Sequence, residues 1–130
     1  MRRSLLALLL VLTFACSLPA AGRADCRMRL HEKVALLGGM DDPDVFVWDS
    51  QFRLAGYQTG TYDVAKALLP HAWVVPPGTR AIVLACVPNF VHPRYRGFTD
   101  DALRIVMLNG PYRGKSGWVM SQDMRRMHFR

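Results

Sequence analysis

The sequence is poor in the residues from which metal centres are usually built. It contains three cysteines and four histidines among 130 residues, and no two histidines stand at the close spacing typical of zinc ligands. The acidic cluster of Asp41, Asp42 and Asp44 lacks the alternating oxygen ligands, the glycine and the distal glutamate of a calcium loop. This cluster favours a solvated turn, and we expect neither a metal site nor a cofactor.

Signs of an enzyme are equally scarce. No serine stands in a nucleophile-elbow pattern. The glycines between residues 110 and 117 precede a Trp-Val pair, whereas a phosphate-binding loop would precede a helix. Because a Ser-His-Asp triad assembles from residues distant in sequence, a hydrolase is kept as a third alternative. The expectation is nevertheless a protein that is not an enzyme.

Long apolar runs are absent except at the N-terminus. Arg2 and Arg3 precede an apolar run over residues 5–12, which is the order of a secretory signal peptide. A membrane-spanning helix needs about 20 predominantly apolar residues, and this run is shorter. Residues 1–24 are therefore predicted to be a signal peptide cleaved before Asp25, leaving one domain over residues 25–130.

A second interpretation of the leader uses Cys16, which would be lipidated and become the new N-terminus. Thr13 and Phe14 fit a lipoprotein box poorly, so this alternative is the less favoured one. Loss of the leader removes three of the 17 basic residues and none of the 10 acidic ones, so 14 minus 10 leaves a net charge of +4. The expected location is periplasmic or secreted.

Two cysteines, Cys26 and Cys86, remain after cleavage. In an oxidising compartment such a pair is expected to form a disulfide, which would join the N-terminus of the exported chain to a central strand. A cross-link over this length of chain is expected to stabilise the fold by roughly 4 kcal/mol. The alternative is two separate buried thiols.

Short apolar runs separated by turn residues predict a mainly β domain. Strands are expected over residues 34–37, 45–48, 72–75, 79–87 and 102–108, with 52–57 either strand or ordered loop. Thr61 is expected to cap one short helix over residues 62–69, which Pro70 ends. The polar stretch 88–101 is expected to be an exposed loop.

The C-terminal third carries a recognisable order of elements. The apolar run 103–108 leads into Asn109-Gly110-Pro111-Tyr112-Arg113-Gly114-Lys115-Ser116-Gly117-Trp118-Val119, and then into Met120-Ser121-Gln122-Asp123-Met124. This order resembles the end of a bacterial Src-homology-3-like domain, in which a strand, a Gly-rich turn and a Gly-Trp-Val strand precede one tight helical turn and a last short strand. With a similar turn and strand upstream, the resemblance covers residues 72–124. It implies a small Src-homology-3-like barrel, here with an N-terminal β elaboration and one short helix.

The chain departs from the proline-peptide binders of that superfamily. It has no Ala-Leu-Tyr-Asp-Tyr-type segment and no tandem Trp pair, and Met120 and Asp123 stand where a Pro and a Tyr would be expected. Recognition of proline-rich helices, which depends on aromatic slots, is therefore not expected. The resemblance does not extend to residues 30–71, which are a candidate for the part that carries specificity.

Basic and aromatic residues gather toward the C-terminus. The candidate ligand-binding residues are Arg94, Arg96, Tyr112, Arg113 and Lys115. Such a surface attracts anionic polymers, and export argues against nucleic acid as the polymer. The alternative is an ordinary solvated face.

Aromatic side chains in a small barrel are usually core residues. Of Trp48, Trp73 and Trp118, we expect Trp118 to be the core member, and we expect Tyr112 at the hairpin tip to be exposed. The functional hypothesis is a binding module that attaches to peptidoglycan or another cell-envelope component. The alternative is an accessory or inhibitor-type factor that acts on a periplasmic or secreted protein.

Overall fold

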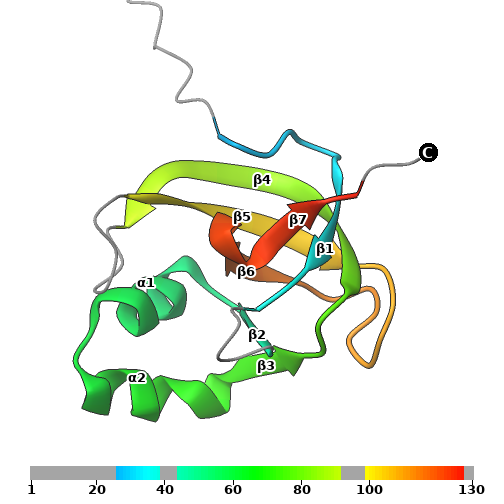
Figure 1. The fold of residues 1–130 in the computed structure, drawn as a ribbon. Helices are drawn as coiled ribbons and strands as arrows, with labels where there is room; N and C mark the ends of the chain where they lie inside the picture. The colour runs from blue at the N-terminus through cyan, green and yellow to red at the C-terminus, as the bar shows by residue number, and fades with distance from the viewer. Residues whose placement is uncertain (1–25, 39–43, 92–98, 128–130) are drawn as a thin grey trace, which may run out of the picture.

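The computed structural model describes residues 26–38, 44–91 and 99–127 (Figure 1). The predicted signal peptide and the loop residues Arg94 and Arg96 lie outside this part. In chain order the elements are β1 (Lys33–Leu36), β2 (Val45–Trp48), α1 (Gln51–Thr59), α2 (Tyr62–Leu68), the 3-10 turn η1 (Leu69–His71), β3 (Ala72–Val75), β4 (Thr79–Val91), β5 (Asp100–Met107), β6 (Ser116–Met120), the 3-10 turn η2 (Ser121–Asp123) and β7 (Met124–Arg126). The domain is mainly β, as predicted.

The strands of the described part form a single antiparallel sheet in the order β3-β2-β6-β5-β4-β1-β7. The long strand β4 pairs with β1 through its first residues and with β5 along most of its length. Its register shifts between Val83 and Ala85 and again between Val87 and Val91. Because such irregularities bend a strand and increase its twist, β4 curves and the sheet curls into a half-barrel (Figure 1).

The inside of the half-barrel is filled by aliphatic and methionine side chains. Alternate residues of β5, Leu103, Ile105 and Met107, point into it, as the period of two in a strand requires. The fully buried members of this cluster are Val34, Leu36, Val45, Val47, Val75, Ala81, Val83, Leu103, Ile105, Met107, Val119 and Met124. Both ends of the described chain contribute, so the core joins the N- and C-terminal strands.

A second apolar cluster lies on the outer face of the sheet. In β2, Val47 points into the half-barrel, whereas Trp48 points to the opposite face and is buried with Leu54 of α1. Tyr57 of α1 lies 5.0 Å from the Trp48 ring, centroid to centroid. The helices α1 and α2 therefore cover one part of the outer face, beside β2 and β3 (Figure 1).

The helical content differs from the prediction of one short helix. Residues 51–59, of which 52–57 were expected to be strand or loop, form α1. The Ser50 side chain caps this helix by accepting a hydrogen bond from the Arg53 backbone N–H at 3.2 Å, a pattern typical of helix starts. Leu54 and Tyr57, one helical turn apart, both reach the second cluster. The predicted helix at 62–69 is confirmed as α2, capped by Thr61.

Strand β4 extends past the position where it was expected to end. Pro88 was expected to start an exposed loop, but β4 continues to Val91. Proline is tolerated in a strand at an irregularity where no ladder hydrogen bond is required of it. Pro88 lies within the second register shift, and Asn89 next to it adopts a φ of 47°.

Among the three tryptophans, the prediction that Trp118 is the core member is wrong. Trp48 is fully buried, whereas Trp118 is half-buried and packs at the margin of the second cluster. The two are directly opposite each other across the β2–β6 pair. The helix α1, which the sequence pattern did not reveal, covers Trp48 and accounts for its burial.

A buried carboxylate holds η2 against the sheet. Asp100, at the start of β5, accepts hydrogen bonds from the Ser121 hydroxyl, from the Gln122 backbone N–H at 3.1 Å and from the Asp101 backbone N–H at 2.9 Å. Burial of a carboxylate is costly unless its oxygens are hydrogen-bonded. The three donors meet this requirement and fix the chain between β6 and β7.

Candidate functional site

Two glycines and two backbone hydrogen bonds define the conformation of the hairpin between β5 and β6. Gly110 and Gly114 adopt φ angles of 79° and 83°, which glycine reaches without strain. The Gly114 N–H donates to the Met107 carbonyl at 2.8 Å, and the Lys115 N–H donates to the Tyr112 carbonyl at 3.0 Å. Three predicted ligand-binding residues, Tyr112, Arg113 and Lys115, are thereby held on one compact loop.

Tyr112 and Lys115 meet a residue from a distant part of the chain. The ring of Tyr112 stacks on Trp73 of β3, with centroids 5.9 Å apart and planes inclined by 25°. The ammonium of Lys115 lies 5.5 Å from the centroid of the Trp73 ring, within the range of a cation–π interaction. The three side chains form what we call the hairpin cluster: Trp73, Tyr112 and Lys115.

The absence of a side chain at residue 117 makes room for Trp73. A Cβ at Gly117 would lie 2.5 Å from Val47 Cγ1 and 2.8 Å from the Trp48 carbonyl oxygen, distances that van der Waals contact does not allow. The backbone of β2 therefore approaches β6 closely at Gly117, as glycine in a strand often permits. Trp73 itself was not assigned to the site, because nothing in the local pattern of residues 72–75 shows what lies opposite this strand.

Tyr112 is less exposed than expected. It is half-buried against Trp73 and the margin of the first core, so the prediction of an exposed aromatic at the tip is wrong. The stacking partner comes from β3, 39 positions earlier in the chain, and stacked aromatic pairs add stability beyond their buried area. Tyr112 is nevertheless partly accessible, and the next residue, Arg113, is exposed.

The hairpin carries two exposed cations. Arg113 and Lys115 are both exposed, and neither has an acidic partner among the described residues. The other two candidate residues, Arg94 and Arg96, fall outside the part that the structure describes. The site that can be built from described residues is therefore two unpaired cations beside a stacked aromatic pair.

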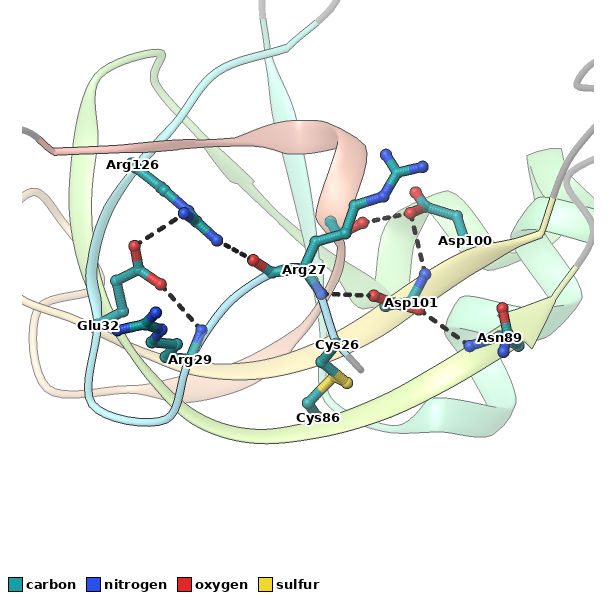
Figure 2. The surroundings of a disulfide bond; sticks show 10 residues. Cys26, Arg27, Arg29, Glu32, Cys86, Asn89, Asp100, Asp101 and Arg126 are labelled. Carbon is teal, nitrogen blue, oxygen red and sulfur yellow. Dashed lines mark hydrogen bonds and ion pairs between the residues drawn. A yellow bond between two sulfur atoms is a disulfide. The ribbon is translucent and has the colours of Figure 1, made fainter. Parts of the chain in front are cut away.

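The predicted disulfide is confirmed. Cys26 is bonded to Cys86 of β4, with their Cα atoms 6.4 Å apart. Beside it, the Asp101 carboxylate accepts hydrogen bonds from the backbone N–H groups of Arg27 at 3.1 Å and Asn89 at 2.9 Å (Figure 2). The covalent bond and the two hydrogen bonds hold the segment before β1 against β4 and β5.

A second polar contact lies farther along the same segment. Arg126 of β7 pairs with Glu32 at 3.2 Å and donates to the Arg27 carbonyl (Figure 2). Glu32 also accepts from the Arg29 backbone N–H at 2.9 Å. Residues 26–32 are thus tied to both the central and the last strands.

Within residues 26–38, 44–91 and 99–127, one group has metal-ligand atoms close together. The sulfurs of Cys26 and Cys86 and a carboxylate oxygen of Asp101 lie within 4.8 Å of one another. The two sulfurs are bonded to each other, and metal ligation requires thiolates. Both Asp101 oxygens already accept hydrogen bonds. We therefore assign this group a structural role, which is to hold the segment before β1 against β4 and β5.

Comparisons with family models, with curated proteins and with solved structures give no match for this chain. In the described part, no helix has the length and apolar character needed to cross a membrane. The functional argument therefore rests on the residues and their geometry.

Proposed function

We propose that the chain is an exported, non-catalytic Src-homology-3-like domain that attaches to an anionic cell-envelope polymer, with peptidoglycan as the first candidate. The hairpin cluster and Arg113 are the proposed contact surface. The observation that carries the proposal is the pair of exposed cations, Arg113 and Lys115, that have no acidic partner among the described residues.

The order of elements at the C-terminal end supports the family assignment. Strand β5 leads through the Gly110 and Gly114 turn into β6, which contains Gly117-Trp118-Val119, and then come the single turn η2 and the short strand β7. This is the order that motivated the resemblance. The disulfide supports export, since such bonds persist in oxidising compartments.

The chemistry of the surface fits an anionic polymer. Exposed cations raise the local concentration of anionic ligands and speed their association, while an aromatic pair supplies rigid contact area at small cost in conformational entropy. Because the charges are exposed, salt weakens this attraction within a Debye length of roughly 8 Å at physiological ionic strength. Binding that survives moderate salt therefore requires the aromatic contact as well.

Co-sedimentation of the exported protein with isolated sacculi, at low and moderate salt, tests the proposal. The double substitution R113A/K115A is expected to reduce the bound fraction at both salt concentrations. The matched control R29A/K66A removes one arginine and one lysine that are also exposed but lie away from the hairpin. Loss of binding in both double variants would leave only nonspecific charge attraction, and absence of wild-type binding would overturn the proposal.

A second candidate function, a factor that binds an envelope protein, is favoured by the helices. Phe52 of α1 is 85% exposed and Tyr62 of α2 is 73% exposed, and exposed aromatic side chains mark an interaction site where they form a contiguous patch. Both lie in the segment 30–71 that matched no family. Under this alternative, F52A/Y62A abolishes crosslinking to a partner in the native envelope and leaves sacculus binding unchanged.

A further inference from the structure

The two edges of the sheet differ in chemistry. At one edge, β7 carries Arg125 and Arg126, both exposed. At the other edge, β3 consists of Ala72-Trp73-Val74-Val75 and carries no charge. Edge strands expose unpaired backbone groups, and proteins usually protect them with charged residues, bulges or covering segments. Within the described residues, β7 has the charged protection and β3 does not.

The backbone of β3 has one partner strand. It pairs with β2 through the register Val45–Val75 to Trp48–Ala72, and residues 73–75 make no other hydrogen bond within the described part of the chain. Val74 is 47% exposed, whereas Val75 is buried. Among the described residues, no strand or loop pairs with the outer side of β3, where backbone groups stand next to the apolar side chain of Val74.

The two faces beside this edge are chemically different. Val74 lies on the face that carries the helices, since its cross-strand partner Phe46 packs against Tyr57 of α1 at 5.7 Å between ring centroids. Trp73 lies on the other face, where Lys115 stands near its ring. A strand added here would direct alternate side chains to these two faces. One set would meet Val74, and the other set would lie on the side of the hairpin cations.

We propose that the outer edge of β3 accepts an extended acidic segment of a partner protein by strand addition. The segment carries aliphatic residues at alternate positions, next to Val74, and glutamate or aspartate at the intervening positions, on the side of Lys115 and Arg113. Backbone hydrogen bonds supply affinity in this mode of recognition, and the alternating side chains supply specificity. This inference goes beyond polymer binding: the backbone edge of β3 is a new element of recognition, whereas Arg113 and Lys115 belong to the surface proposed for the polymer as well.

Charge decides between an acidic segment and a second copy of the chain. Two copies joined edge to edge through β3 would bring two sets of exposed cations together, because Arg113 and Lys115 lie on the hairpin that packs against Trp73. Like charges at an interface oppose association. The same cations attract an acidic strand, so the acidic partner is the occupant that we infer.

The first test uses the full exported chain and a short capped peptide in which valine and glutamate alternate. Amide hydrogen exchange and backbone chemical shifts are measured residue by residue. The expected result is slower exchange at those amides of residues 73–75 that point away from β2 when this peptide is added, and no such protection with an alternating valine–lysine peptide or with a peptide of the same composition arranged in blocks. Shift changes confined to residues 112–115 would overturn the proposal, because they would show charge attraction without strand addition.

The second test compares two substitutions that add the same charge at similarly exposed valines. Val74 on β3 is 47% exposed and Val64 on α2 is 44% exposed. V74E is expected to weaken binding of the alternating valine–glutamate peptide about fivefold, through loss of an apolar cross-strand contact, while V64E leaves the affinity nearly unchanged. Equal weakening in both variants would contradict the proposal. Thermal unfolding of both proteins checks that the fold is retained.

Discussion

Gly117 lies directly beneath the indole of Trp73, and a Cβ at residue 117 would stand 3.1 Å from Trp73 Cζ3. This relationship joins β3, which follows the two helices, to β6 at the centre of the sheet. It also fixes the position of the ring on which Tyr112 stacks and over which Lys115 lies. The stability of the domain and the shape of its proposed binding surface therefore depend on the same contact.

Substitution of Gly117 by alanine tests this contact. The added methyl group meets the Trp48 carbonyl and the Val47 side chain, so G117A is expected to lower the free energy of unfolding by about 1–3 kcal/mol. Urea unfolding followed by tryptophan fluorescence measures the change. G114A is the matched control, because nothing lies within 4 Å of the added Cβ there and its cost, about 1 kcal/mol, comes from the positive φ alone. A G117A protein no less stable than G114A would contradict the packing argument.

The disulfide is expected to contribute strongly to stability. Cys26 and Cys86 are separated by 60 residues, and in the chain-entropy account closure of such a loop contributes roughly 4 kcal/mol. The double substitution C26S/C86S is therefore expected to lower the urea midpoint by a large fraction, since small domains have only about 5–15 kcal/mol of stability in total. Thiol reductant should lower the midpoint of the wild-type protein and leave that of the double variant unchanged. An equal response of both proteins to reductant would contradict this account.

The Asp101 carboxylate is expected to matter even with the disulfide intact. D101A leaves the backbone N–H groups of Arg27 and Asn89 without this acceptor, and because both hydrogen bonds are only partly buried, each is expected to contribute about 0.5–1.5 kcal/mol. Hydrogen exchange at these two amides should increase by more than the loss of global stability explains. S116A, which removes only an exposed contact with Arg104, serves as a control that leaves both amides unchanged. Unchanged exchange in D101A would show that other groups hold this segment.

Elements of the fold that depend on a short stretch of sequence could be predicted, whereas elements that depend on contacts between distant stretches could not. Short apolar runs and turn residues located most strands, and the two cysteines that follow the predicted leader identified the disulfide, because these signals are local or allow a single pairing. Helix α1 was missed since Leu54 and Tyr57 face a cluster built partly by Trp48 and Met120, and that cluster exists only after β2 and β6 pair. The continuation of β4 through Pro88 depended likewise on a register shift.

The residues of the candidate site also differ in whether a local sequence pattern could predict them. Tyr112, Arg113 and Lys115 stand together in sequence, so a local pattern could find them. Trp73 belongs to the site only through the approach of β3 to the hairpin across β2 and Gly117, which no local pattern records. A glycine next to a tryptophan in a predicted strand was the available signal, and it indicated a close approach without naming the partner.

The last prediction separates the aromatic and cationic contributions to binding. Y112F retains a ring that stacks on Trp73 and is expected to keep sacculus binding at moderate salt. Y112A removes the ring and with it both the aromatic contact area offered to the polymer and the stack on Trp73, so binding at moderate salt is expected to fall several-fold. K115A should instead weaken binding most at low salt, where charge attraction is least screened. Bound fractions measured across a salt series distinguish these patterns. Equal salt dependence of Y112A and K115A would mean that Tyr112 acts only by positioning the lysine, and the aromatic contact would be removed from the proposed binding surface.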